Sequence, residues 1–207
     1  MNKKLEHIIL IIYCLTLLIM IGGATWAYFT VIRVSSISPK VDVNSATTSY
    51  ILFETGKPIN LYATRENFSK NMGNLSSNTF AQAYIKANDP ETPTSVNYNL
   101  YLEILDNDFV YSTEDKNAEL LFSIKDPNGN EVTQINGLEY VTISGVSGFD
   151  ITAKKGRFYI ATNHPITTTS EKYDRWDATV TFVNLDASQD LNYEKNLKGY
   201  ILIEKAE

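Results

Sequence analysis

Beyond residue 50 the chain consists of short runs of β-branched and aromatic residues, separated by Gly, Asn, Asp and Pro. In the clearest run, Tyr98, Leu100, Leu102 and Ile104 alternate with more polar residues, which predicts a strand with one buried face and one wetter face. Helical periodicity is hard to find in this region. Strands at this spacing are typical of two packed sheets, so we predict an all-β fold, an antiparallel β-sandwich, over residues 50–207.

The sequence also predicts where the strands and several turns lie. Pro127 and Gly129 suit a chain reversal, which predicts a hairpin that joins residues 120–125 to residues 131–135. Pro90 and Pro93 exclude residues 88–95 from a central strand and predict a surface loop. Residues 63–78 are polar and predict a loop or a short helix, and residues 145–148 predict a loop between strands. The predicted strands are Tyr50–Glu54, Ile59–Tyr62, Thr79–Ala87, 97–104, Leu120–Lys125, Tyr140–Ser144, Phe158–Thr162, 179–182 and Gly199–Glu204.

The N-terminus has the three parts of an export signal. Lys3 and Lys4 precede an uncharged, mostly apolar run, 8–32, with small residues that suit cleavage after Ala27. As a helix rising about 1.5 Å per residue, this run would be roughly 38 Å long, against about 30 Å for a hydrocarbon core. Two interpretations stay open: residues 1–27 are a cleaved signal peptide, or a transmembrane anchor extends to about residue 32. In both, the lysines stay in the cytoplasm and the rest is extracellular or on the cell surface.

Charge and cysteine content fit an exported domain. The whole chain has a net charge of −6, and removing residues 1–27 takes away two lysines and one glutamate, so the remainder is more acidic. An acidic surface repels phosphate backbones, so nucleic acid is not an expected partner. The single cysteine, Cys14, lies in the apolar run, which excludes a disulfide in the exterior domain.

The junction Gly22-Gly23-Ala24-Thr25-Trp26-Ala27-Tyr28-Phe29 resembles the end of the signal peptides of TasA and camelysin proteins of Gram-positive bacteria, which a SipW-type signal peptidase cleaves. The run from Thr179 to Asp186 and the C-terminal Gly199–Ile203 are similar to the closing strands of small exported proteins with such signals. The resemblance implies a jelly-roll-like sandwich that can assemble into fibres of the biofilm matrix. It also implies a SipW-type signal peptidase as partner and a peptidase recognition region at Ala24, Thr25, Trp26 and Ala27.

Camelysins have been described as metalloproteases, so the resemblance raises the question of a zinc site. Zinc catalysis needs about three His or carboxylate ligands at close spacing, and the chain has only His7 and His164. His164 precedes Pro165, which predicts a solvated turn residue. The sequence predicts no catalytic residue, metal ligand or cofactor, and therefore no enzyme.

Other polar and aromatic groups have structural explanations. Asp126, Asn128 and Asn130 lack the glycine and glutamate positions of an EF-hand loop, and a hairpin turn accounts for them. The group Asp186, Ser188 and Asp190 is likewise predicted to be a surface loop. The 13 tyrosines with Trp176 could form a sugar-binding face, but such rings are also favoured in the core of a sandwich.

Two functions remain as hypotheses. In the first, the protein is a non-catalytic surface or matrix component, and residues 28–49 are an extended segment that adds as a strand to the open sheet edge of a neighbour. The neighbour is a second copy, which gives a homopolymer, or a related matrix protein. In the second, 8–32 is a single-pass anchor, 28–49 is a tether, and the sandwich is an exterior binding module that presents its loops to a ligand. The donor residues of the first hypothesis are Phe29, Val31, Ile32 and Val34.

Overall fold

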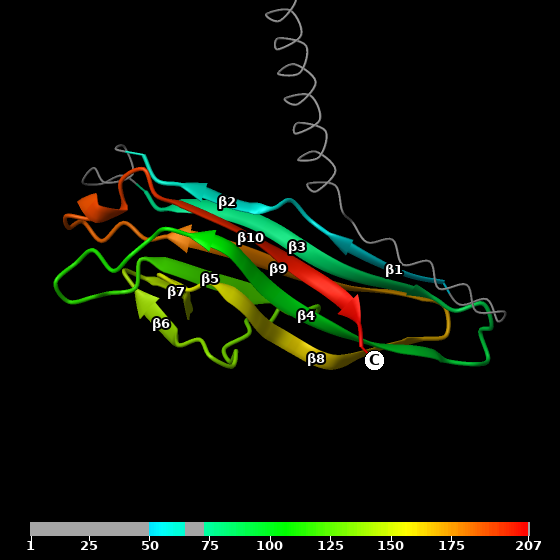
Figure 1. Ribbon diagram of the computed structural model, residues 1–207. Helices are drawn as coiled ribbons and strands as arrows, with labels where there is room; N and C mark the ends of the chain where they lie inside the picture. Colours follow the sequence, from blue (N-terminus) through cyan, green and yellow to red (C-terminus); the bar gives the residue numbers. More distant parts are fainter. Residues whose placement is uncertain (1–49, 65–72, 207) are drawn as a thin grey trace, which may run out of the picture. The chain divides into compact units, whose positions relative to one another are not determined.

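A computed structural model describes residues 50–64 and 73–206, all of which belong to one compact unit of the chain. These residues form ten strands and one short 3-10 turn, Asp190–Asn192 (Figure 1). The prediction of an all-β fold with two antiparallel sheets is therefore confirmed.

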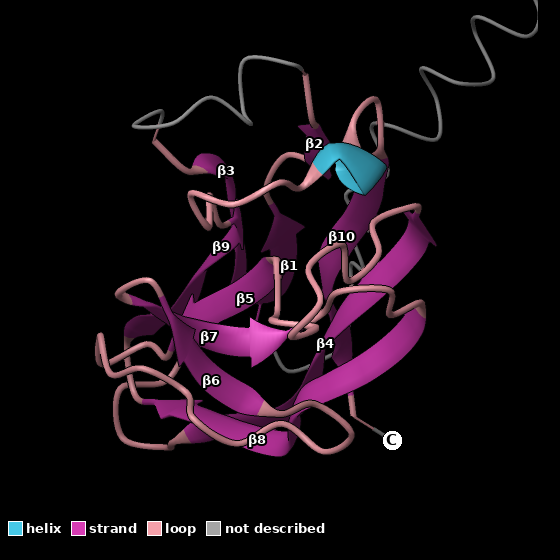
Figure 2. Cartoon of the chain, turned by 90° about the vertical axis from the view of Figure 1, so that its left-hand side faces the viewer, coloured by secondary structure: helices cyan, strands magenta, loops and turns pink. Residues whose placement is uncertain are grey.

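The strands are divided between a six-stranded and a four-stranded sheet, which face each other (Figure 2). Successive strands alternate between the two sheets from β1 to β5 and again from β7 to β10, whereas β5, β6 and β7 share one sheet. Neighbours within a sheet are therefore mostly distant in sequence. In order across the six-stranded sheet the strands are β1 (Tyr50–Thr55), β3 (Leu75–Lys86), β9 (Glu171–Phe182), β5 (Leu120–Lys125), β7 (Val146–Asp150) and β6 (Tyr140–Ile143). In the four-stranded sheet they are β2 (Ile59–Tyr62), β10 (Asn196–Lys205), β4 (Thr94–Asn107) and β8 (Gly156–Thr168).

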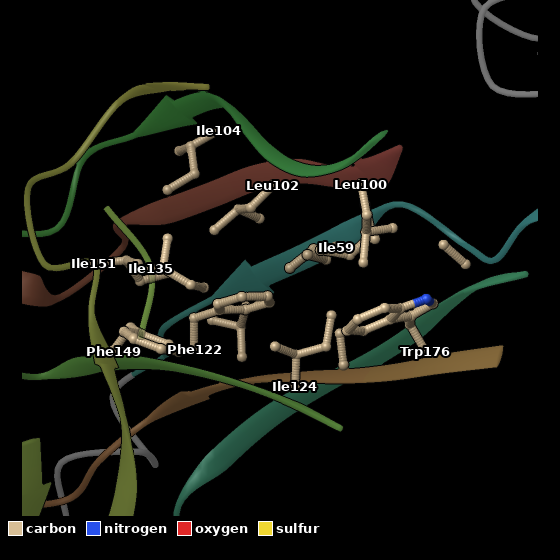
Figure 3. Packing of buried hydrophobic residues seen from close by; sticks show 14 of the residues in the cluster. Ile59, Leu100, Leu102, Ile104, Phe122, Ile124, Ile135, Phe149, Ile151 and Trp176 are labelled. Atoms are coloured by element: carbon tan, nitrogen blue, oxygen red, sulfur yellow. The ribbon is translucent and has the colours of Figure 1, made fainter. Parts of the chain in front are cut away.

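The core lies between the sheets and follows from the alternation seen in the sequence. Leu100, Leu102 and Ile104 of β4 are buried and point toward the six-stranded sheet, where they meet Phe122 of β5 and Trp176 of β9 (Figure 3). Full burial of such a side chain stabilises the fold by about 1.5–3 kcal/mol. The predicted inward face of β4 is confirmed.

Three predicted loops are shorter than expected because strands extend into them. Residues 75–78 belong to β3, where Ser76 hydrogen bonds Thr181 and Asn78 accepts from Thr179 on the outer face of the sheet. Polar residues are stable there because that face is in contact with solvent. Thr94 and Ser95 begin β4, and residues 146–148 belong to β7. Of the predicted loop 145–148 only Gly145 remains, in a turn with Ser144, which was expected to end the preceding strand.

The predicted reversal at residues 126–130 is confirmed. The Gly129 N–H donates to the Asp126 carbonyl, and Gly129 has a φ of 83°, which glycine adopts without strain. The returning chain, however, pairs with β5 through an isolated bridge between Lys125 and Glu131 and a hydrogen bond from the Val132 N–H to the Ile124 carbonyl, and the predicted strand over 131–135 does not form.

Candidate functional site

The free edge of β1 is the best-formed site for strand addition among the described residues. β1 pairs with β3 in unbroken register, and the N–H of Gly56, the next residue, donates to the Phe80 carbonyl at 2.7 Å. Because hydrogen-bonded pairs alternate along antiparallel strands, Ile51, Phe53 and Thr55 direct their backbone N–H and C=O groups away from β3. Within 50–64 and 73–206, no strand pairs with that side of β1.

The other three sheet edges are shorter or are protected. The edge strand β6 has only four residues. At the edge strand β2, the N–H of Asn60 that points away from the sheet donates to Ser77 Oγ at 3.4 Å, so this donor already has a partner. β8 contains Pro165 and the positive-φ residue Asn163, and its pairing with β4 is irregular at two places. Such irregularities are a usual way of preventing edge-to-edge association. β1 has no proline, glycine or lysine within it.

A row of tyrosines lies on the outer face of the six-stranded sheet, beside this edge. Tyr84 of β3 and Tyr173 of β9 are directly opposite each other, and their rings stack with centroids 4.4 Å apart and planes inclined by 29°. Tyr50 of β1 meets Tyr84 edge-on at 6.1 Å. Tyr50 is 43% exposed and Tyr173 is 56% exposed.

A hydrogen bond to a carboxylate anchors the middle ring of this row. The Tyr84 hydroxyl donates to Glu171 Oε2 at 3.1 Å. Partial desolvation, and then the hydrogen bond and negative charge of Glu171, raise the pKa of Tyr84 above its usual value of 10.0. Trp176 is not on this face: its ring is buried in the core, as the alternative explanation of the aromatic residues expected, and its Nε1–H donates to Tyr98 Oη.

The prediction that His164 is a solvated turn residue is wrong. His164 lies within β8, opposite Tyr98 of β4, and its ring contacts both Tyr98 and Trp176. Its Nε2 is 3.7 Å from Oδ2 of the buried Asp174, which also accepts the Tyr98 hydroxyl at 3.2 Å. The turn prediction failed because proline at the outer edge of a sheet does not interrupt the ladder.

The cluster around Asp174 joins the two sheets. Tyr98 and His164 come from the four-stranded sheet, and Asp174 and Trp176 come from β9 in the other. Lys172 Nζ lies 3.4 Å from the second carboxylate oxygen of Asp174. Burial, assisted by the charge of Asp174 and opposed by the hydrogen bond from Trp176, raises the pKa of Tyr98, so this phenol stays protonated and donates.

A second polar cluster surrounds Glu119, which the sequence analysis did not single out. Glu119 is fully buried just before β5, and Oε1 accepts from the backbone N–H and hydroxyl of Ser112 at 2.6 and 2.7 Å. Oε2 accepts from the side-chain amides of Gln189 and Asn192 at 2.6 and 2.7 Å. The carboxylate thereby ties the loop before β5 to the loop between β9 and β10. The only indication of this cluster in the sequence was that the charged Glu119 stands between an alanine and an apolar strand.

The polar triplets predicted to be turns have that role. Asp126 Oδ1 accepts from the N–H groups of Asn128 and Asn130, which stabilises the turn after β5. Ser188 donates to Asp190 in the loop before β10. In the part of the chain that the structure describes, no three His, Cys, Asp or Glu side chains gather where they could hold a metal ion.

The predicted N-terminal sites lie outside the described residues. They are the peptidase region, Ala24, Thr25, Trp26 and Ala27, and the strand donors, Phe29, Val31, Ile32 and Val34. Among residues 50–64 and 73–206, none of the helical structure is long and apolar enough to cross a membrane.

Comparison with known proteins found no matching family, no similar curated protein and no similar solved structure.

Proposed function

We propose that the protein is an exported, non-catalytic component of the cell surface or extracellular matrix, which assembles with copies of itself by strand addition. The observation that carries this proposal is the regular edge of β1, with which no other described strand pairs. Ile51, Phe53 and Thr55 offer backbone donors and acceptors there, and an added strand would extend the six-stranded sheet. The alternation of successive strands between the sheets supports the finer proposal of a jelly-roll-like sandwich.

The donor in this proposal is the apolar segment that follows Ala27. In an extended conformation Phe29 and Val31 would face one side, and Ile32 and Val34 the other. One side would continue the inner face of the acceptor sheet, and the other would continue the outer face beside Tyr50. The resemblance to TasA and camelysin signal peptides supports export and cleavage by a SipW-type signal peptidase at Ala24–Ala27, and a fibre of the biofilm matrix as the assembled form.

Polymerisation of the secreted protein tests the proposal from both ends of the contact. Deletion of residues 28–34 removes the donor, and Thr55→Pro removes one outward N–H from the acceptor edge. We expect both variants to stay folded by circular dichroism and monomeric by light scattering, while wild type forms fibres. Thr55→Val is the matched control, because it keeps the N–H and nearly the same shape. Fibres from the truncated chain would contradict the mechanism.

The second candidate is a membrane-tethered exterior binding module, in which residues 8–32 stay as an anchor. The exposed rings of Tyr50 and Tyr173 in the tyrosine row favour it, because exposed aromatic rings are common in binding surfaces. The mass of the native N-terminus separates the two candidates. A chain that begins near Tyr28 excludes the tether, and a chain with an intact Met1 excludes the free donor strand.

A further inference from the structure

Tyr84 and Tyr173 form a close pair of phenols that the proposed assembly does not use. They are directly opposite each other in the long, regular pairing of β3 with β9, so the backbone fixes their proximity. Their rings are in van der Waals contact at a centroid distance of 4.4 Å. Tyr173 is more than half exposed, at 56%, so an oxidant in solution can reach it.

The pair also has a proton acceptor in place. A phenol loses an electron most easily when its proton can leave at the same time, and the Tyr84 hydroxyl already donates to Glu171 Oε2 at 3.1 Å. Glu171 is exposed and can pass this proton to water. A tyrosine is protonated at neutral pH, and the pKa of Tyr84 is raised further, so this phenol has to pass its proton to an acceptor when it is oxidised.

We propose that Tyr84 and Tyr173 are an oxidative modification site, at which a haem peroxidase and hydrogen peroxide join the two rings as dityrosine. Each phenol gives up one electron and its hydroxyl proton to become a phenoxyl radical. The radicals couple through a new bond between one ortho carbon of each ring, and both ortho hydrogens move to the phenoxyl oxygens as the rings regain aromaticity. The two electrons and two protons reduce one hydrogen peroxide to two waters.

The product would be a covalent tie between β3 and β9 in an exterior domain that has no cysteine. A cross-link of this kind limits the conformations of the unfolded chain, as a disulfide does. The site depends only on the geometry of the folded domain, so it stands or falls independently of whether the protein forms fibres.

Another tyrosine pair in the same domain provides an internal control. Tyr101 and Tyr159 are 5.6 Å apart with planes inclined by 54°, and the guanidinium of Arg157 covers the Tyr101 ring at 4.0 Å. Tyr101 is also buried, with 5% exposure. This pair is less well aligned and less accessible, so it should not couple under conditions that join Tyr84 to Tyr173.

The test is mild oxidation of the dilute full-length protein with a haem peroxidase and hydrogen peroxide. We expect blue dityrosine fluorescence, an intact chain lighter by two hydrogen atoms, and a tryptic product that joins peptide 71–86 to peptide 173–175. Tyr173→Phe keeps the ring and should abolish all three signals, whereas Tyr159→Phe should leave them unchanged. Glu171→Gln should slow the coupling, because an amide does not accept the proton.

Three results would overturn the inference. One is an undiminished yield of intrachain dityrosine in Tyr173→Phe, and another is a cross-linked peptide that contains a different tyrosine pair. The third is oxidation of the wild-type chain that yields only links between separate chains.

Discussion

Replacing Glu119 by alanine should destabilise the domain strongly, although the residue is far from the proposed assembly edge. The carboxylate is fully buried and accepts four hydrogen bonds, from two groups of Ser112 and from the amides of Gln189 and Asn192. Gln189 and Asn192 each keep a second acceptor, the carbonyls of Val183 and Val110. The substitution therefore leaves one N–H of each amide and the backbone N–H of Ser112 unpaired.

An unsatisfied buried donor costs about 1–3 kcal/mol, so three of them give a loss of roughly 3–5 kcal/mol once some water enters the cavity. Domains of this kind have a free energy of unfolding of about 5–15 kcal/mol, so the loss is a large part of the total. Glu119→Gln keeps the shape but turns an NH₂ group toward donors, and we expect an intermediate loss of about 2 kcal/mol.

Urea unfolding followed by tryptophan fluorescence measures this difference, because Trp176 is buried in the core. Glu114→Ala is the matched control: that side chain is exposed in the same loop, so its replacement should change the stability by less than about 0.5 kcal/mol. A Glu119→Ala variant within about 1 kcal/mol of wild type would refute the view that this carboxylate holds the two loops together.

Three further predictions concern close packing and pH. Gly199→Ala should lower the free energy of unfolding by about 1–3 kcal/mol, measured by heat or urea, because a Cβ there would lie 2.8 Å from the Glu103 carbonyl oxygen. Gly73→Ala is the control and should be neutral, because a Cβ at that position has no described atom within 4 Å. Burial and the hydrogen bond to Asp150 raise the pKa of Tyr111 from 10.0 to about 12. The protonated phenol therefore contributes fully to the free energy of unfolding below pH 10, and this contribution is lost as the pH rises through 12. Tyr111→Phe should remove this pH dependence from the alkaline unfolding profile. For Asp126, desolvation raises the pKa, but the hydrogen bonds from Asn130 and Asn128 outweigh it and lower the pKa below 3.8. Asp126→Ala should therefore be less stable than wild type at neutral pH, where the carboxylate is charged. The difference in the free energy of unfolding should shrink as the pH falls below 3.8.

The strands could be located from the sequence because alternation is a local signal. Side chains of a half-buried strand must point in turn to the core and to solvent, so the inward set of β4, from Tyr98 to Ile104, was readable without a structure. Turns were readable for a similar reason, since Pro127 and Gly129 restrict their own backbone angles. The peptidase region and donor residues at the N-terminus remain predictions from sequence.

The candidate edge was only half predictable. Residues 50–54 were expected to be a strand, but nothing in them indicates that β3 would pair with one side and that no other described strand would pair with the other. Edge or central position depends on which strands pair, and here the partners come from distant parts of the chain, as in β3 with β9. A β-propensity pattern carries no information about such partners.

By itself, the sequence determined that the chain beyond residue 50 is a two-sheet β protein, because short-range alternation and turn chemistry are encoded residue by residue. Only the tertiary structure decided which residues meet: Glu119 with Gln189, Tyr98 with Asp174, and Tyr84 with Tyr173. The physical reason is that each of these contacts joins segments far apart in the chain, and their geometry exists only after the sheets have paired and packed.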